Sequence, residues 1–157
     1  MGEVVSLNRI IQLRKHLRRK KVVFTNGVFD LIHYGHVKLL QDCKKLGDVL
    51  IIGVNSDASV RKIKGPLRPI LPFKDRSRIL AALDAVDYVV SFGEQTPYNL
   101  ICKIRPDILV KGSDYKISEI VGAKEVKGGG GKVKRVKLLA GRSTSILIDK
   151  IIRAYRK

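Results

Sequence analysis

The stretch V-V-F-T-N-G-V-F-D-L-I-H-Y-G-H, from Val22 to His36, carries the strongest structural signal in this chain. It opens with an apolar run too short for a helix, passes through a turn at Thr25-Asn26-Gly27 and leads into a helical pattern that begins near Tyr34. A short apolar run of this kind is typical of a β-strand buried on both faces, as in parallel sheets. The stretch therefore predicts the strand, turn and helix start of one βα unit.

The same alternation of short apolar runs and helical periods continues to the end of the chain. Strand-like runs recur at residues 49–54, 86–90 and 108–110, and a further run near residues 133–139 carries basic side chains. Strands that alternate with helices indicate βαβ units. We therefore predict a doubly wound α/β fold with a parallel, five-stranded, Rossmann-like sheet, whose last strand lies at an edge.

The length of 157 residues fits one domain, over residues 1–157. Residues 1–20 are expected to form a basic helix that packs on this domain through leucine and isoleucine side chains. Residues 61–72, with three prolines among basic residues, form the one long irregular loop, and such loops are often functional. The final helix is expected to bury the side chains of Leu147, Ile148, Ile151, Ile152 and Tyr155.

The formal net charge of +18, from 32 Lys and Arg against 14 Asp and Glu, gives a surface that attracts polyanions. Nucleic acid, an anionic membrane, nucleotides and sugar phosphates all fit this charge, and a heat-adapted source would also explain it. The basic run from Arg14 to Lys21 fits a helix with a solvated face, and no nucleic-acid-binding motif accompanies it. With no membrane-spanning stretch and no signal peptide, we expect a cytoplasmic protein without a membrane or nucleic-acid partner.

Two of the three histidines, His33 and His36, flank Gly35 at the expected start of the first sheet-covering helix. Ligands of open parallel sheets bind outside the carboxyl ends of the strands. Residues three apart share a helix face, so both imidazoles would clamp the charge that develops on a phosphate at the helix N-terminus. A histidine near a helix start is also often a cap or a surface residue, and the spacing alone does not decide between these roles. A metal site is not predicted, since no third His and no Cys lies within reach.

T-N-G-V-F-D-L-I-H-Y-G-H, residues 25–36, resembles the H-x-G-H signature of the nucleotidylyltransferase superfamily, with its preceding strand and G-x-F-D turn. Further segments, among them R-P-D-I-L-V-K-G-S-D-Y at 105–115 and G-R-S-T-S at 141–145, are similar to the D-glycero-β-D-manno-heptose 1-phosphate adenylyltransferases, which make ADP-heptose for lipopolysaccharide biosynthesis. That branch often follows a sugar kinase domain, for which this chain has no room, so we expect a free-standing version. Val28, Ser113 and Arg142 stand where the branch usually has Cys, Gly and an uncharged residue.

The resemblance implies roles for individual residues. His33 and His36 would hydrogen-bond the α-phosphate, and Lys64, or its neighbour Arg61 or Lys62, would reach the phosphates. The residues that would bind the nucleotide are Thr25, Asn26, Gly27, Val28, Phe29, Gly35, Lys111, Gly112, Asp114, Arg142, Ser143, Thr144 and Ser145.

Arg76 falls on the apolar helical stripe of Phe73, Leu80 and Leu83. A charge in that place needs an anionic partner or a route to water. The resemblance favours the anionic partner, with Arg76 facing the active-site phosphates as a catalytic residue. Asp30 is either a buried turn-former or a carboxylate that faces a metal.

Ser143-Thr144-Ser145 opens the last helix and fits an ordinary N-terminal cap, which would also cradle a phosphate. The resemblance implies transfer of AMP from ATP to a sugar 1-phosphate, with Mg²⁺ on the phosphates and release of pyrophosphate. A cytidylyltransferase acting on glycerol 3-phosphate is the first alternative, and a non-catalytic basic module that binds nucleic acid is a remote one. The sequence leaves the oligomeric state open, a homodimer included.

Overall fold

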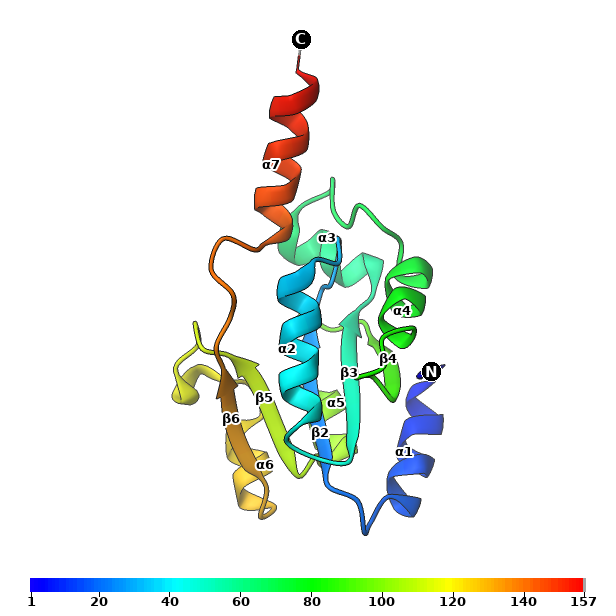
Figure 1. Cartoon of the computed structure of the whole chain (residues 1–157). Helices are drawn as coiled ribbons and strands as arrows, with labels where there is room; N and C mark the ends of the chain where they lie inside the picture. Colours follow the sequence, from blue (N-terminus) through cyan, green and yellow to red (C-terminus); the bar gives the residue numbers. More distant parts are fainter. Residues whose placement is uncertain (157) are drawn as a thin grey trace.

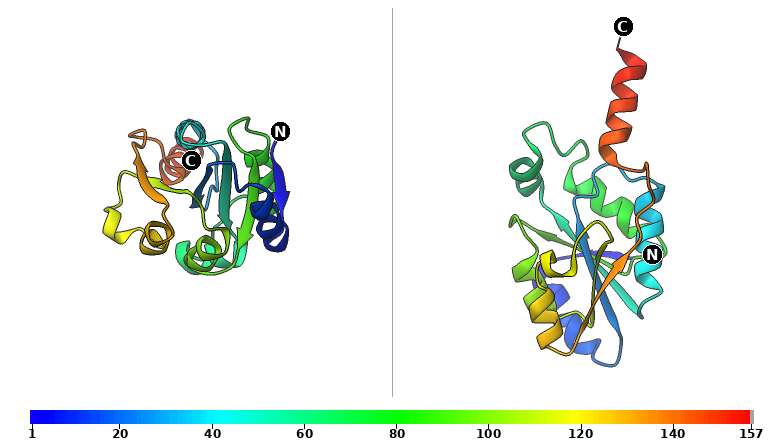
Figure 2. Two further views of the ribbon diagram at one scale, coloured as in Figure 1. Left: turned by 90° about the horizontal axis from the view of Figure 1, so that it is seen from below. Right: turned by 90° about the vertical axis from the view of Figure 1, so that its left-hand side faces the viewer.

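The computed structural model describes residues 1–156 and shows one parallel sheet with helices on both faces (Figures 1 and 2). Lys157, the last residue of the domain expected over residues 1–157, lies outside the described residues. The strand order is β1-β4-β3-β2-β5-β6, and every neighbouring pair is parallel. The strands are β1 (Glu3–Val5), β2 (Val22–Gly27), β3 (Val49–Asn55), β4 (Tyr88–Phe92), β5 (Ile108–Gly112) and β6 (Lys132–Val136).

The sheet has six strands, so the expectation of five was wrong. The additional strand is β1, in the segment expected to be helical, and it pairs with the first three residues of β4. Gly2 leads into it, and a Cβ at this position would lie 2.4 Å from the carbonyl oxygen of Val86. The basic helix follows as α1 (Leu7–His16), capped by the Ser6 hydroxyl, which accepts a hydrogen bond from the Arg9 N–H. A three-residue edge strand is too short to give a periodic signal.

The helices build one apolar core on each face of the sheet. One core packs α2 (Tyr34–Lys44) and α4 (Phe73–Ala81) against the sheet, and its centre holds Leu40, Cys43 and Leu80. The other core packs α1, α5 (Tyr98–Ile104) and α6 (Ala123–Gly128) against the opposite face, around Phe24 and Ile101. The remaining short helices, α3 (Asp57–Lys64) and η1 (Ile117–Glu119), lie in loops that follow β3 and β5. β3 is buried along its whole length, as the continuous apolar run indicated.

The order of the strands places a switch point beside β2. From β2 the chain adds β3 and β4 on one side, then crosses back to add β5 and β6 on the other. Ligands of doubly wound sheets bind at such a point, outside the carboxyl ends of the strands. β6 is an edge strand with exposed lysines, as predicted, although it ends at Val136.

The last helix, α7 (Thr144–Tyr155), projects away from the sheet (Figures 1 and 2), and none of its residues is buried. The expectation that its apolar face is buried in the domain was wrong, since the exposed fraction is 52% for Ile151, 49% for Ile152 and 83% for Tyr155. Leu147 and Ile148 are half-buried. Among residues 1–156, no helix has both the length and the apolar character that crossing a membrane requires.

Candidate active site

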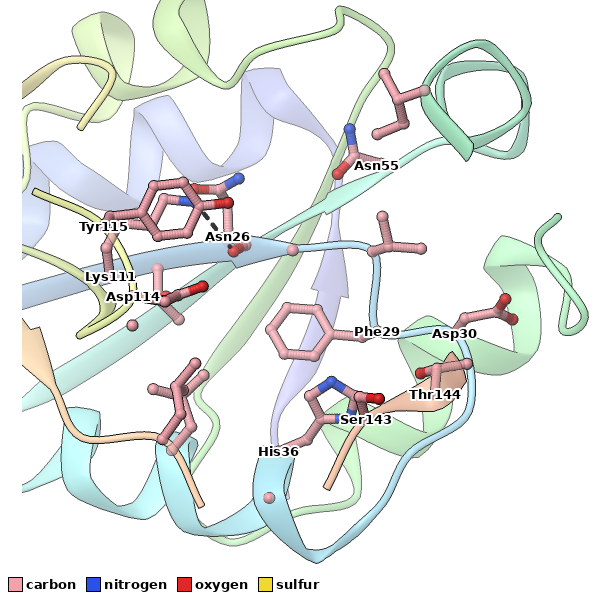
Figure 3. Close-up of a pocket in the computed structure, with 18 of the residues that line it drawn as sticks. Asn26, Phe29, Asp30, His36, Asn55, Lys111, Asp114, Tyr115, Ser143 and Thr144 are labelled. Carbon is pink, nitrogen blue, oxygen red and sulfur yellow. Dashed lines mark hydrogen bonds between the residues drawn. The ribbon is translucent and has the colours of Figure 1, made fainter. Parts of the chain in front are cut away.

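A pocket of about 600 Å³ opens at the carboxyl ends of the strands, beside the switch point (Figure 3). It is built from the ends of β2, β3 and β5, the start of α2 and the start of α7. Most of the residues that the sequence nominated line this pocket; Arg76 and the alternatives Arg61 and Lys62 do not. The nominated residues that line it are Thr25, Asn26, Gly27, Val28, Phe29, His33, Gly35, His36, Lys64, Lys111, Gly112, Asp114, Arg142, Ser143, Thr144 and Ser145.

The two signature histidines form a stacked pair at the start of α2. Their ring centroids lie 3.8 Å apart, with an angle of 19° between the planes. Phe29 supports the pair from the side, because its ring meets His36 edge-on at 5.2 Å. The backbone of Phe29 has φ of 50°, which is uncommon for a bulky residue. The pair is therefore held by packing, with both rings on one side of the backbone.

The imidazoles carry unused hydrogen-bonding capacity. The Nδ1 atoms of His33 and His36 are buried and have no hydrogen-bond partner among the described residues. Burial, together with the nearby His33, lowers the pKa of His36 to about 4. Burial and the positive charge of Arg142 also lower the pKa of His33 below its usual value. Both rings are therefore neutral at pH 7 without ligand, and an anion beside them would favour protonation.

A second helix start lies beside the first. Ser143 caps α7, since its hydroxyl accepts a hydrogen bond of 3.2 Å from the N–H of Ile146. The Thr144 hydroxyl donates to the carbonyl oxygen of Leu31, in the loop before α2. A Cβ at Gly35 would lie 3.1 Å from the Cβ of Arg142, so this glycine permits the close approach. Two positive helix ends thus converge on the imidazole pair, which suits an anionic ligand.

Of the three basic residues at the end of α3, only Lys64 lines the pocket, whereas Arg61 and Lys62 do not. All three side chains are exposed, and α3 ends at Lys64 because Gly65 adopts φ of 95°. Lys64 is therefore the member of the trio that can reach a bound phosphate. Its role in catalysis stays a prediction.

Arg76 does not line the pocket. The prediction that its guanidinium faces the active-site phosphates was therefore wrong. Arg76 is fully buried, and its guanidinium donates to the carbonyl oxygens of Leu71, Val28 and Asn55. The Asp57 carboxylate lies 2.7 Å from Nη2 and balances the charge. Arg76 therefore ties the turn after β2 to the end of β3 and to the proline-rich loop.

The sequence left two roles open for Asp30, a buried turn-former or a carboxylate that faces a metal. The structure agrees with the first, because Asp30 is buried. Its carboxylate is 1% exposed and accepts hydrogen bonds from the N–H groups of Ile70 and Leu71 and from the Arg68 guanidinium. Burial alone would raise the pKa of Asp30, but the Leu71 and Ile70 amides and Arg68 lower it below its usual range. Arg68 also lines the pocket, although the sequence analysis gave it no role. Its position in the basic loop of residues 61–72 was the signal that could have identified it as a pocket residue.

Lys111 and Asn26 meet on the other side of the pocket, where Nζ of Lys111 donates to the backbone carbonyl of Asn26 at 3.5 Å (Figure 3). The ammonium also lies 5.5 Å from the centre of the Tyr115 ring. Burial lowers the pKa of Lys111 to about 8, against the opposing effect of Asp114. The wall continues with residues that the sequence analysis missed, and the signal for them is that each lies at the end of a strand or in the segment after it. They are Asn55, Gln95, Thr96, Glu119, Ile120 and Val121.

The fold and this site together define an α/β nucleotidyltransferase. Comparison with known proteins agrees, since a family model described as cytidylyltransferase-like matches residues 24–150, and the chain belongs to that family. It is 54% identical to the bifunctional protein HldE of Citrifermentans bemidjiense over 142 residues, which are 90% of this chain. The corresponding protein of Geobacter metallireducens is 55% identical over 146 residues, or 93% of this chain. The chain spans 29% and 30% of the length of these two relatives.

Solved structures support the same fold. The lipopolysaccharide core biosynthesis protein of Thermoplasma volcanium superposes with a TM-score of 0.62 at 31% identity, over 76% of this chain and 97% of that one. A pantoate-β-alanine ligase of Francisella tularensis superposes with a TM-score of 0.63 over 100% of this chain and 80% of that one. Its identity of 16% supports the architecture alone.

Proposed function

We propose that this protein transfers AMP from ATP to a sugar 1-phosphate and releases pyrophosphate. The observation that carries the proposal is the stacked pair of His33 and His36 between the starts of α2 and α7. Imidazole and backbone N–H donors that converge on one point stabilise charge on a phosphate group.

The reaction needs no covalent intermediate. A phosphate oxygen of the sugar 1-phosphate attacks the α-phosphorus of ATP, and the bond between that phosphorus and the oxygen bridging to the β-phosphate breaks. His33 and His36 donate to the α-phosphate oxygens, where charge accumulates in the transition state. Lys64 and the start of α7 hold the departing pyrophosphate. Catalysis then consists of positioning and of neutralising charge.

Mg²⁺ would enter with ATP as a complex of the two. Among residues 1–156, no three His, Cys, Asp or Glu side chains are grouped so that they would hold a metal ion. Asp30, the acidic side chain closest to the signature turn in sequence, is engaged by Arg68 and two amides. Mg²⁺ prefers substrate phosphates and water as ligands, which agrees with this arrangement.

The acceptor that we propose is D-glycero-β-D-manno-heptose 1-phosphate. Support comes from the segments that resemble the heptose 1-phosphate adenylyltransferases and from the relatives at 54% and 55% identity. The similarity to a lipopolysaccharide core biosynthesis protein is consistent with the same acceptor. A cytidylyltransferase acting on glycerol 3-phosphate is not favoured, because these relatives are bifunctional HldE proteins.

The test is a matrix of reactions. Each of ATP, CTP, GTP and UTP is incubated with Mg²⁺ and with either heptose 1-phosphate or glycerol 3-phosphate, and pyrophosphate release is measured. We expect turnover with ATP and heptose 1-phosphate, and an ADP-heptose product in the mass spectrum. Turnover only with CTP and glycerol 3-phosphate would replace the proposal by its first alternative. Retention on nucleic acid without turnover in any reaction would favour a binding module.

A further inference from the structure

The end of β2 divides the pocket into two compartments on opposite faces of the sheet. Phe24 and Leu109 point into the core beneath α5. Side chains two residues apart in a strand point to the same face. Asn26 and Lys111 therefore point to the α5 face, and Figure 3 shows them on the other side of β2 from His36.

We name the compartment on the α2 face the imidazole compartment, since it holds His33, His36 and the start of α7. The compartment on the α5 face is the amide compartment. It includes the ends of β2, β3 and β5 and the loops that lead into α5 and α6. Its polar side chains are Asn26, Asn55, Gln95, Thr96, Lys111 and Glu119.

The two compartments differ in chemistry. The imidazole compartment combines two helix N-termini, two imidazoles and Arg142, which suits a triphosphate. The amide compartment offers amides, a hydroxyl and a carboxylate around one ammonium, that of Lys111. Amide, hydroxyl and carboxylate groups can bind the hydroxyl groups of a ligand, and the single ammonium can bind one phosphate. This set matches a molecule with many hydroxyl groups and one phosphate.

Two groups in the amide compartment have unused hydrogen-bonding capacity. The amide oxygen of Asn26 is buried and accepts no hydrogen bond from any described residue. A buried oxygen without a donor is unfavourable by about 1–3 kcal/mol, so a ligand hydroxyl would satisfy it. The half-buried ammonium of Lys111 has only one long hydrogen bond, to the carbonyl of Asn26. An anionic ligand group would stabilise its charge.

The proposed reaction also separates its two substrates in space. The attacking and leaving oxygens lie roughly in line on opposite sides of the phosphorus. With the α-phosphate beside the imidazole pair and the leaving pyrophosphate toward the start of α7, the attacking phosphate approaches from the side opposite α7. The amide compartment is the other compartment of the pocket, and we place the attacking phosphate there.

We infer that the amide compartment is the subsite for the sugar phosphate, with the Lys111 ammonium on its phosphate and with Asn26, Gln95 and Glu119 on its hydroxyl groups. This inference rests on the proposed function. It reassigns Asn26 and Lys111, which the sequence resemblance had placed with the nucleotide, to the acceptor. It also makes the loop before α5 and the loop before α6 the segments that select the sugar.

The test compares Lys111→Met with the wild type in two separate assays. The first measures the Kd of α,β-methylene ATP with Mg²⁺ by calorimetry, which requires no turnover. The second measures the KM for heptose 1-phosphate from pyrophosphate release. Lys134→Met is the matched control, because Lys134 is exposed on the neighbouring strand β6 and lies outside the pocket.

We expect Lys111→Met to leave the Kd of the ATP analogue within about twofold and to raise the KM for the sugar phosphate about tenfold to a hundredfold. Gln95→Ala should raise the same KM by a smaller factor, and Lys134→Met should change neither constant. A tenfold weaker analogue with an unchanged KM for the sugar phosphate would overturn the inference, because Lys111 would then serve the nucleotide.

Failure of the proposed function is distinguishable from failure of this inference. If the wild type binds the ATP analogue but converts no heptose 1-phosphate, heptose 1-phosphate and other hexose and heptose 1-phosphates are titrated by calorimetry into the analogue complex. Binding that is lost in Lys111→Met would support the subsite although the heptose assignment fails. Equal binding by both proteins, or binding of none of these compounds, would overturn the subsite.

Discussion

Replacing Arg76 by methionine separates a structural role from a catalytic one. The guanidinium is fully buried and donates to three carbonyl oxygens and to the Asp57 carboxylate. Methionine keeps much of the side-chain length but removes all donors. The carbonyl oxygens of Val28, Asn55 and Leu71 would then lose their side-chain donor inside the protein.

The expected loss of stability follows from these contacts. Three carbonyl hydrogen bonds at about 1 kcal/mol each give about 3 kcal/mol. Removing one partner of a buried ion pair is unfavourable by about 3–5 kcal/mol, and the lower part of this range applies because the Asp57 side chain is 29% exposed and stays hydrated. The two estimates overlap, so we expect a loss of about 3–4 kcal/mol. For a chain of this length, that lowers Tm by about 6–16 °C.

Thermal and urea unfolding measure this loss directly. Arg78→Met is the matched control, since the Arg78 side chain is exposed on the same helix and makes no hydrogen bond or ion pair with the described residues. The Tm of this variant should change by less than about 2 °C. Binding of α,β-methylene ATP is then measured well below the Tm of each variant. An Arg76→Met protein with wild-type Tm and lost nucleotide binding would refute this reasoning, because it would place the guanidinium on phosphate.

Three further predictions address the imidazole pair and α7. His36→Ala should lower kcat about 10²- to 10³-fold in the pyrophosphate assay with little change in circular dichroism, and an unchanged kcat would remove this ring from the mechanism. The pKa of His36, lowered from 6.5 to about 4 in the folded state, means that the unfolded chain binds more protons between these values. Tm should therefore fall as pH decreases from 7 to 4.5, by more in the wild type than in His36→Gln, and identical slopes would contradict the lowered pKa. Ile151→Glu, at a half-exposed position, should lower Tm by less than about 3 °C, whereas Ile52→Ala in the core should remove about 2–5 kcal/mol; a large loss for Ile151→Glu would mean that the apolar stripe of α7 is covered in solution.

The sequence predicted the central βα unit and the members of the pocket because both signals are local. The apolar run that begins at Val22 is short and continuous, and His33 and His36 lie three residues apart at a helix start. Once the strands are parallel, their carboxyl ends share one edge of the sheet. Lys111 and Ser143, far apart in the chain, were assigned to the nucleotide site by the family resemblance, and both line the pocket at this edge.

The errors concern features that depend on tertiary contacts. The position of Arg76 on an apolar stripe shows that its charge needs partners, but not that the partners are carbonyl oxygens of two loops and of the end of β3. The apolar period of α7 shows that the helix has an apolar face, but not that this face lies outside the domain. Asn55 and Gln95 enter the pocket only because β3 lies beside β2 and β4 lies beside β3, an order that periodicity does not give.

A crystal structure of the protein with α,β-methylene ATP and Mg²⁺ would show directly whether His33 and His36 bind the α-phosphate. We predict the α-phosphate within about 3 Å of a ring nitrogen of His33 or His36, with the remaining phosphates at the start of α7 and beside Lys64. A triphosphate that occupies the amide compartment, or that binds anywhere without touching the two imidazoles, would contradict this prediction.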